Sequence, residues 1–162
     1  MRRLGLVLLG VAVAVAGLIA LAVAFNARDD PDLSTAPQGP GELQPEGGGE
    51  WPTSGEHRDE LVTRDRRELT DDQILTALEA GNVVILYDAP GPGTNLVRLQ
   101  REVSGPFDAE LAAAGQAVIL ARRSGAGPAT ALAWRRALEV DDSADPRLRE
   151  FTEAWLGRGL GN

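Results

Sequence analysis

The chain has 162 residues, a formal net charge of −8 and no cysteine. Without cysteine there is neither a disulfide framework nor thiol chemistry, so stability has to come from a packed core. All 24 acidic residues and 14 of the 16 basic residues follow residue 25, which gives this part of the chain a charge of −10. Such a surface repels nucleic acid, which is therefore not an expected partner.

The chain begins with an uncharged apolar run from Leu4 to Phe25, directly after two arginines. A helix of this length spans about 33 Å, enough to cross a hydrocarbon core of about 30 Å. Acidic residues follow the run, so the positive-inside rule places the N-terminus in the cytoplasm. Residues 1–28 are thus expected to be a single-pass signal anchor (span 4–25) in the plasma membrane. A cleaved signal peptide is the alternative, because Ala22-Val23-Ala24 resembles a cleavage site.

Residues 29–50 are rich in proline, glycine and glutamate and almost free of large apolar side chains. Such a composition cannot bury enough surface to offset the entropy of ordering, so we expect a disordered linker. The folded, extracytoplasmic domain is then expected over residues 51–162, a length sufficient for one core.

The first half of this domain contains clear local patterns. Thr70-Asp-Asp-Gln73 has the form of a capping box and Gly81 that of a helix C-cap, so a helix of about ten residues is predicted between them. The continuous apolar run Val83–Tyr87 predicts a buried strand. A proline- and glycine-rich loop from Asp88 to Gly93 follows, and Thr94 is expected to cap the next helix.

The second half is predicted in the same way. A short helix is expected near residues 107–114, a strand at 117–121, a turn at 124–128 and a strand at 130–138 that pairs antiparallel with its predecessor. Asp145-Pro146 predicts the start of a final helix. The predicted order is α-β-α-β-β-α, an α+β fold with helices on a small sheet.

Several short segments resemble a family of bacterial membrane-anchored proteins of unknown function, the DUF3105 family. Trp51-Pro-Thr-Ser-Gly-Glu-His57 is similar to its P-P-T-S-G-P-H segment, and Leu78-Glu-Ala-Gly81 to its H-x-L-E-H-G segment. Ala133-Trp-Arg135, Phe151 and the closing Gly157-Arg-Gly also fit family positions. These matches keep their order and spacing over nearly the whole exported domain.

The resemblance implies a site built from three histidines, and imidazole suits zinc, copper, iron and nickel. This chain retains only His57, because the two positions of H-x-L-E-H are occupied by Thr76 and Ala80. Glu79 persists. One histidine and one carboxylate make a poor metal site without further ligands, so this member is expected to have lost any metal chemistry that the family has.

His57 therefore has several possible roles. It could be a residual metal ligand together with Glu79, or a base for the hydroxyl of Ser54. It could instead bond a backbone carbonyl and fix the N-terminal segment to the domain, which we favour because no second ligand is visible. For Glu79, pairing with an arginine is the more ordinary expectation.

The loop Asp88-Ala-Pro-Gly-Pro-Gly-Thr94 is a second candidate, since a glycine-rich turn into a helix can present N–H groups to an anion. The strand, G-P-G turn and helix, with Pro128 before a later strand, also resemble thioredoxin-like proteins, but both redox cysteines are absent. Ser54, Tyr87, Asp88 and Trp134 are candidate ligand or interaction residues.

Two functions follow from these patterns. The preferred one is a non-catalytic, membrane-anchored module that binds an envelope protein or small ligand, including a paralogue with all three histidines, and uses no cofactor. The alternative is a reduced metal-binding or metal-dependent protein that uses His57 and Glu79, with Tyr87 or Asp88 nearby.

Overall fold

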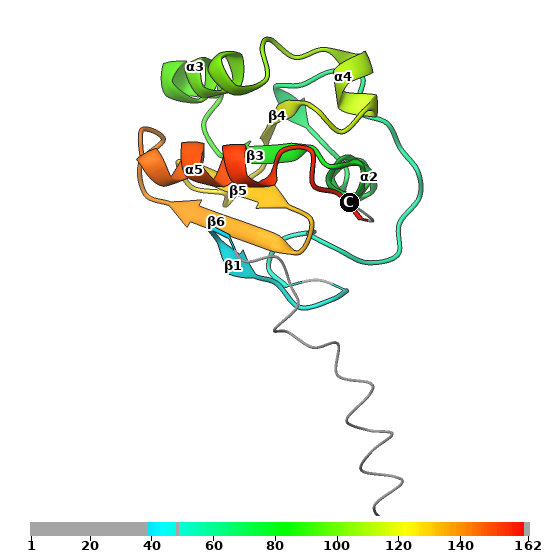
Figure 1. Cartoon of the computed structure of the whole chain (residues 1–162). Helices are drawn as coiled ribbons and strands as arrows, with labels where there is room; N and C mark the ends of the chain where they lie inside the picture. Colours follow the sequence, from blue (N-terminus) through cyan, green and yellow to red (C-terminus); the bar gives the residue numbers. More distant parts are fainter. Residues whose placement is uncertain (1–38, 48, 161–162) are drawn as a thin grey trace, which may run out of the picture. The chain divides into compact units, whose positions relative to one another are not determined.

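The computed structural model of the chain describes residues 39–47 and 49–160 (Figure 1). Within these residues, no helix combines the length and the apolar character needed to cross a membrane. The span expected at residues 4–25, and the linker up to residue 38, lie outside the described part of the chain. From Gly39 onward the chain packs as one compact unit.

The described part forms a small mixed α/β domain in which four helices accompany one six-stranded sheet. In chain order the elements are β1 (Glu42–Leu43), β2 (Arg67–Glu68), α2 (Asp71–Ala80), β3 (Val83–Tyr87), α3 (Gly93–Val103), α4 (Ala109–Ala113), β4 (Val118–Arg122), β5 (Ala129–Ala133), β6 (Arg136–Val140) and α5 (Pro146–Trp155). The strand order across the sheet is β1-β6-β5-β3-β4-β2. The central strand β3 pairs parallel with β4 and antiparallel with β5.

The sheet buries both of its faces, and the alternation along β3 shows why this strand is apolar throughout. Val84 and Leu86 belong to a cluster that includes Ile74 and Leu78 of α2. Val83, Ile85 and Tyr87 point the other way, into a cluster with side chains of α3 and α5. Both faces therefore carry helices, which is the arrangement expected for a sheet with parallel strands.

The connections explain which helix covers which face. The link from β2 to β3 through α2 runs across the sheet in one direction, and the link from β3 to β4 through α3 runs back. Right-handed crossovers in opposite directions put their helices on opposite faces. The site described below lies on the α2 side.

The locally encoded elements are confirmed. Thr70 and Gln73 form the predicted reciprocal capping box of α2, and Gly81 ends this helix in the left-handed region at φ 111°. β3 has the predicted bounds, and α5 begins at Pro146 with Asp145 as its N-cap. The N-cap predicted for α3 was wrong. The N-cap is Pro92, which makes no side-chain capping bond, and Thr94 is already inside the helix.

The predicted strand pairing was wrong. The expected strand over residues 130–138 is divided into β5 and β6 by a turn at Trp134-Arg135, where Arg135 has φ +57°. β5 pairs with β3 and not with β4. The turn of residues 124–128 therefore joins two strands on either side of β3. A short turn suggests a hairpin, but the long-range pairing of three apolar strands decides the order.

The predicted disorder of residues 29–50 does not hold from Gly39 onward. β1 pairs antiparallel with β6, and the carbonyl of Pro40 accepts a hydrogen bond of 2.8 Å from Trp155 Nε1. Gly41 lies against the Phe151 ring, which leaves no space for a side chain. Glycine and proline, typical of linkers, here allow the backbone to approach aromatic side chains closely. These contacts extend the folded unit upstream of the expected start at residue 51.

Candidate functional site

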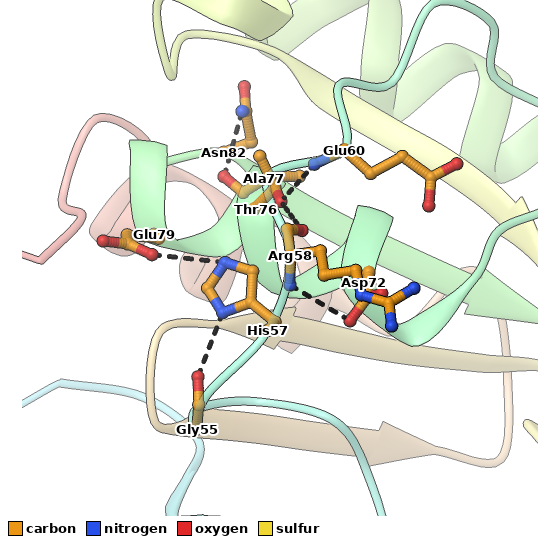
Figure 2. Close-up of polar contacts among 9 residues, drawn as sticks. All are labelled: Gly55, His57, Arg58, Glu60, Asp72, Thr76, Ala77, Glu79 and Asn82. Atoms are coloured by element: carbon orange, nitrogen blue, oxygen red, sulfur yellow. Dashed lines mark hydrogen bonds and ion pairs between the residues drawn. The ribbon is translucent and has the colours of Figure 1, made fainter.

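The segment that carries the only histidine runs along α2 and is fixed to it by polar contacts (Figure 2). Thr76 Oγ1 accepts a hydrogen bond of 3.0 Å from the Glu60 amide and donates one of 3.2 Å to the Arg58 carbonyl. The Arg58 amide in turn donates to Asp72 Oδ1 at 3.4 Å. Thr76 thus holds the His57 segment against α2.

His57 lies between a backbone carbonyl and a carboxylate. Its Nδ1 is 3.0 Å from the carbonyl oxygen of Gly55, and its Nε2 is 3.2 Å from Glu79 Oε2 (Figure 2). A carbonyl oxygen only accepts, so Nδ1 carries a proton. The imidazole side chain is 6% exposed and that of Glu79 41%.

The contact between His57 Nε2 and Glu79 is close in distance but not aligned as a hydrogen bond, since this nitrogen has no properly oriented acceptor. The pair is therefore a close polar contact between a buried imidazole and a carboxylate that water reaches on one side. The expected arginine partner of Glu79 is replaced by histidine.

The C-terminal segment closes over the same end of α2. The amide of Gly157 donates to the Gly81 carbonyl at 2.8 Å, and that of Leu160 donates to the Glu79 carbonyl at 3.0 Å. A Cβ at Gly159 would lie 2.0 Å from the Glu79 carbonyl oxygen, so only glycine fits there. Glu79 thus stands where α2, the His57 segment and the C-terminal segment meet.

The turn between β5 and β6 contacts the segment that precedes His57. The amide of Arg135 donates a hydrogen bond of 2.9 Å to the carbonyl of Thr53. Trp134 beside it is partly buried and packs against the core cluster on the α2 face. The left-handed backbone of Arg135, unusual for a residue with a side chain, has no signal in the sequence.

Buried polar atoms without a hydrogen-bond partner in the described residues gather in these segments: Thr53 Oγ1, His57 Nε2 and Arg135 Nε. Such atoms are rare in folded proteins, and bound water or ligand is a common explanation. Two of these residues, Thr53 and Arg135, are joined by a backbone hydrogen bond, and the third, His57, contacts Glu79 of α2.

Ser54 is buried, and its Oγ lies 3.4 Å from the carbonyl of Pro45, at the limit of a hydrogen bond. Both nitrogens of His57 face other groups, Gly55 and Glu79. The geometry therefore does not give Ser54 the base that a nucleophilic serine requires.

Tyr87 and Asp88 do not join the pair. His57 and Glu79 lie where α2 ends, beside the beginning of β3, whereas Tyr87 ends this five-residue strand. A strand of this length is about 16 Å long. Tyr87 is buried on the opposite face, among the side chains of α3 and α5, and Asp88 is exposed in the following loop.

The environment of Tyr87 shifts the pKa of its hydroxyl. Burial raises its pKa above 10.0, the nearby Asp65 raises it further, and Arg66 and Arg122 lower it. The phenol thus stays neutral at physiological pH.

Across residues 39–47 and 49–160, no three histidine, aspartate or glutamate side chains are grouped so that they could hold a metal ion. Of the predicted metal ligands, His57 and Glu79 are brought together. Thr76 lies one turn before Glu79 on α2 and offers only its hydroxyl, which the backbone of the His57 segment already uses.

These observations define the class: a small α/β domain in which the His57 segment and the C-terminal segment meet at the C-terminal end of α2. The family model described as "Protein of unknown function (DUF3105)" matches residues 48–160. The chain belongs to this family. Comparison with curated proteins and with solved structures gave no significant match.

Proposed function

We propose that the protein is a single-pass membrane-anchored binding module whose extracytoplasmic domain acts without catalysis. The observation that carries this proposal is the use of His57. Its Nδ1 donates to Gly55, its Nε2 contacts Glu79, and the ring is almost fully buried. A histidine used in this way fastens one segment to a helix and is not presented to a substrate.

The anchor is proposed from the sequence alone, from the 22-residue apolar run at 4–25 and the flanking charges. It places the N-terminus in the cytoplasm and the domain outside the plasma membrane. Reporter fusions test this orientation: a phosphatase that is active only outside the cytoplasm should be active when fused after residue 162. Activity confined to a cytoplasmic reporter would reject it.

The absence of cysteine also favours binding over redox chemistry. The element order is β3-α3-α4-β4-β5-β6-α5, with β4 parallel and β5 antiparallel to β3. This order supports the likeness to thioredoxin-like proteins that the sequence indicates. Their reaction needs cysteine thiolates, and this chain has none.

Cross-linking of the full chain in native membranes tests the proposed binding role. A stable neighbour, identified by mass spectrometry and lost when the exported domain is removed, is expected. A family member with all three histidines is one such neighbour that the family resemblance suggests. Recovery of no neighbour across several cross-linkers would count against the proposal.

A second function, metal binding by a reduced site, is favoured by one observation: Nε2 of His57 is 3.2 Å from a carboxylate oxygen with which it makes no aligned hydrogen bond. Imidazole and carboxylate are both zinc ligands. Calorimetric titration of the full chain with zinc and copper tests this function. Binding at one site that disappears in His57→Ala would support it, and binding that ignores the substitution would reject it.

A further inference from the structure

A groove of about 620 Å³ runs along the N-terminal part of α3, on the face of the sheet opposite the His57 segment. Arg98 and Arg101 line it from α3, and Arg66 lines it from the chain before β2. Pro92 and Val97 supply apolar surface between them. The size falls within the range of pockets for small molecules, about 300–1,000 Å³.

The charge of the groove is opposite to that of the protein. The chain carries −8 overall, yet three arginines gather here. The acidic side chain that lines the groove, Glu102, is engaged by Arg149 of α5. Repulsion between neighbouring arginines is relieved by an anion, which makes the groove electrostatically complementary to an acidic ligand.

The donors of these arginines are only partly used. Arg98 gives one bond to Asn95 Oδ1 at 3.2 Å, and Arg101 makes no hydrogen bond or ion pair within the part of the chain described here. Arg66 Nε is 3.5 Å from Asp65 Oδ2, and one of its terminal nitrogens donates to Gln100 at 3.2 Å. A guanidinium has five N–H donors, so each of the three retains donors for an anionic oxygen.

Hydrogen bonds of Gln100 hold one wall of the groove in place. Gln100 is fully buried on α3; its amide group donates to Asp65 Oδ2 at 2.8 Å and to the Val118 carbonyl at 2.9 Å, while its oxygen accepts from Arg66. The backbone of Arg66 is left-handed, with φ +58°, a conformation that a residue with a side chain rarely adopts. This network holds the guanidinium at the groove, and strain of this kind concentrates at functional sites.

We propose that this groove binds a small organic anion, in which a phosphate or carboxylate group meets Arg66, Arg98 and Arg101 and an apolar part lies on Pro92 and Val97. Arginine is suited to both anionic groups because its planar donors match their oxygens. The start of α3 adds positive potential, since no acidic residue occupies its first turn. The inference deepens the proposed binding function and rests on it.

The test is a titration of the isotope-labelled full chain with inorganic phosphate and, separately, with citrate, at constant ionic strength. Saturable shifts of the backbone amide signals of Gly93, Thr94 and Arg101 are expected in nuclear magnetic resonance spectra. A preference for phosphate identifies a phosphoryl ligand, and a preference for citrate a carboxylate ligand. The absence of saturable shifts with both anions would overturn the proposal.

Two matched variants make the test specific. Arg101→Gln removes an arginine that makes no hydrogen bond or ion pair with the described residues. It should weaken anion binding about tenfold, the typical effect of one charge-assisted contact. Arg58→Gln changes the net charge equally but lies beside α2, and should leave binding unchanged. Equal weakening by both variants would show general charge attraction and reject the site.

Failure here is distinguishable from failure of the proposed function. If the anions do not bind but the cross-linked neighbour is recovered, the module still binds a partner and only the groove inference falls.

Discussion

His57 Nε2 and Glu79 Oε2 lie 3.2 Å apart, and this contact joins an extended segment before β2 to the last turn of α2. The two residues are separated by 22 positions in the sequence. Because the C-terminal segment also bonds to the carbonyl of Glu79, the pair stands at the junction of three parts of the chain.

Replacing His57 tests its structural role. His57→Ala removes a partly buried hydrogen bond to Gly55 and the contact with Glu79, so it should lower the free energy of unfolding by about 1–3 kcal/mol. Glu79→Gln should have a smaller effect, because the carboxylate is 41% exposed and water replaces its contact. Urea denaturation of the full chain measures both. A larger effect of Glu79→Gln than of His57→Ala would contradict the assignment.

The C-terminal segment gives a second prediction. A Cβ at Gly159 would meet the Glu79 carbonyl oxygen at 2.0 Å, so Gly159→Ala must displace this segment from α2 and should destabilise the fold by about 3 kcal/mol. Gly91→Ala is the matched control, since a Cβ there meets nothing within 4 Å. It should be neutral or slightly stabilising. Thermal unfolding that separates the two variants confirms the prediction, and equal melting temperatures would contradict it.

The folded segment before residue 51 gives a third prediction. Gly41 and Gly47 both have positive φ, but a Cβ at Gly41 would lie 2.5 Å from the Phe151 ring, whereas at Gly47 it meets nothing within 4 Å. Gly41→Ala should therefore lower the free energy of unfolding by about 2–4 kcal/mol and Gly47→Ala by about 1 kcal/mol, the strain of the backbone alone. Similar values in a denaturant titration would mean that the backbone at Gly41 does not pack on Phe151 of α5.

Tyr87 gives a prediction about pH. It is the only tyrosine, so tyrosinate absorbance reports on this residue alone. Burial raises its pKa above 10.0 in the folded chain, and Asp65 adds to the shift. The titration midpoint should return to about 10 in denaturant. Because the pKa is higher in the folded state, the stability linked to Tyr87 is complete below pH 10 and is lost as the pH rises through the folded pKa.

Asp65→Asn checks the cause of this shift. It should lower the midpoint of Tyr87 by removing the nearby negative charge, although burial, the larger cause, remains. A midpoint at or below 10 in the folded parent would show that the hydroxyl is not buried.

The parts of the fold that local chemistry decides could be predicted from the sequence. Thr70 and Gln73 bond each other's backbone, and Gly81 is placed where a left-handed residue must end the helix. The turn at Arg135 could not be predicted, because arginine gives no sign of a positive φ. The pairing of β5 with β3 depends on residues more than 40 positions apart, which no local pattern encodes.

The candidate site shows the same division. The family resemblance pointed to His57 and Glu79, but Tyr87 and Asp88 were grouped with them although β3 separates the two ends. The arginine groove was not predicted, because nothing in the sequence shows that Arg66 lies beside the arginines of α3. Its signal lies in α3, where Thr94, Val97, Arg98 and Arg101 recur at the spacing of one helix face.

A last prediction concerns positions 76 and 80 of α2, where the family resemblance implies histidines. Positions 76, 79 and 80 lie on one face of α2 beside His57, so Thr76→His combined with Ala80→His would place two further imidazoles next to the existing pair. Four nitrogen and oxygen ligands suit zinc. The double variant should bind zinc saturably and at least about tenfold more tightly than the parent chain, and adding His57→Ala should reverse most of this gain.

Calorimetry with zinc measures this gain, and the matched control is Thr76→Gln with Ala80→Gln. The control also removes the bonds of Thr76 to the Arg58 and Glu60 backbone, so it separates a loss of folding from a lack of ligands. Zinc binding by the histidine variant alone would mean that the C-terminal end of α2 keeps the shape of a metal site and that only the ligands are missing. Binding that is no tighter than in the control, in a chain that still folds, would mean that the His57 segment is positioned for fastening and not for coordination.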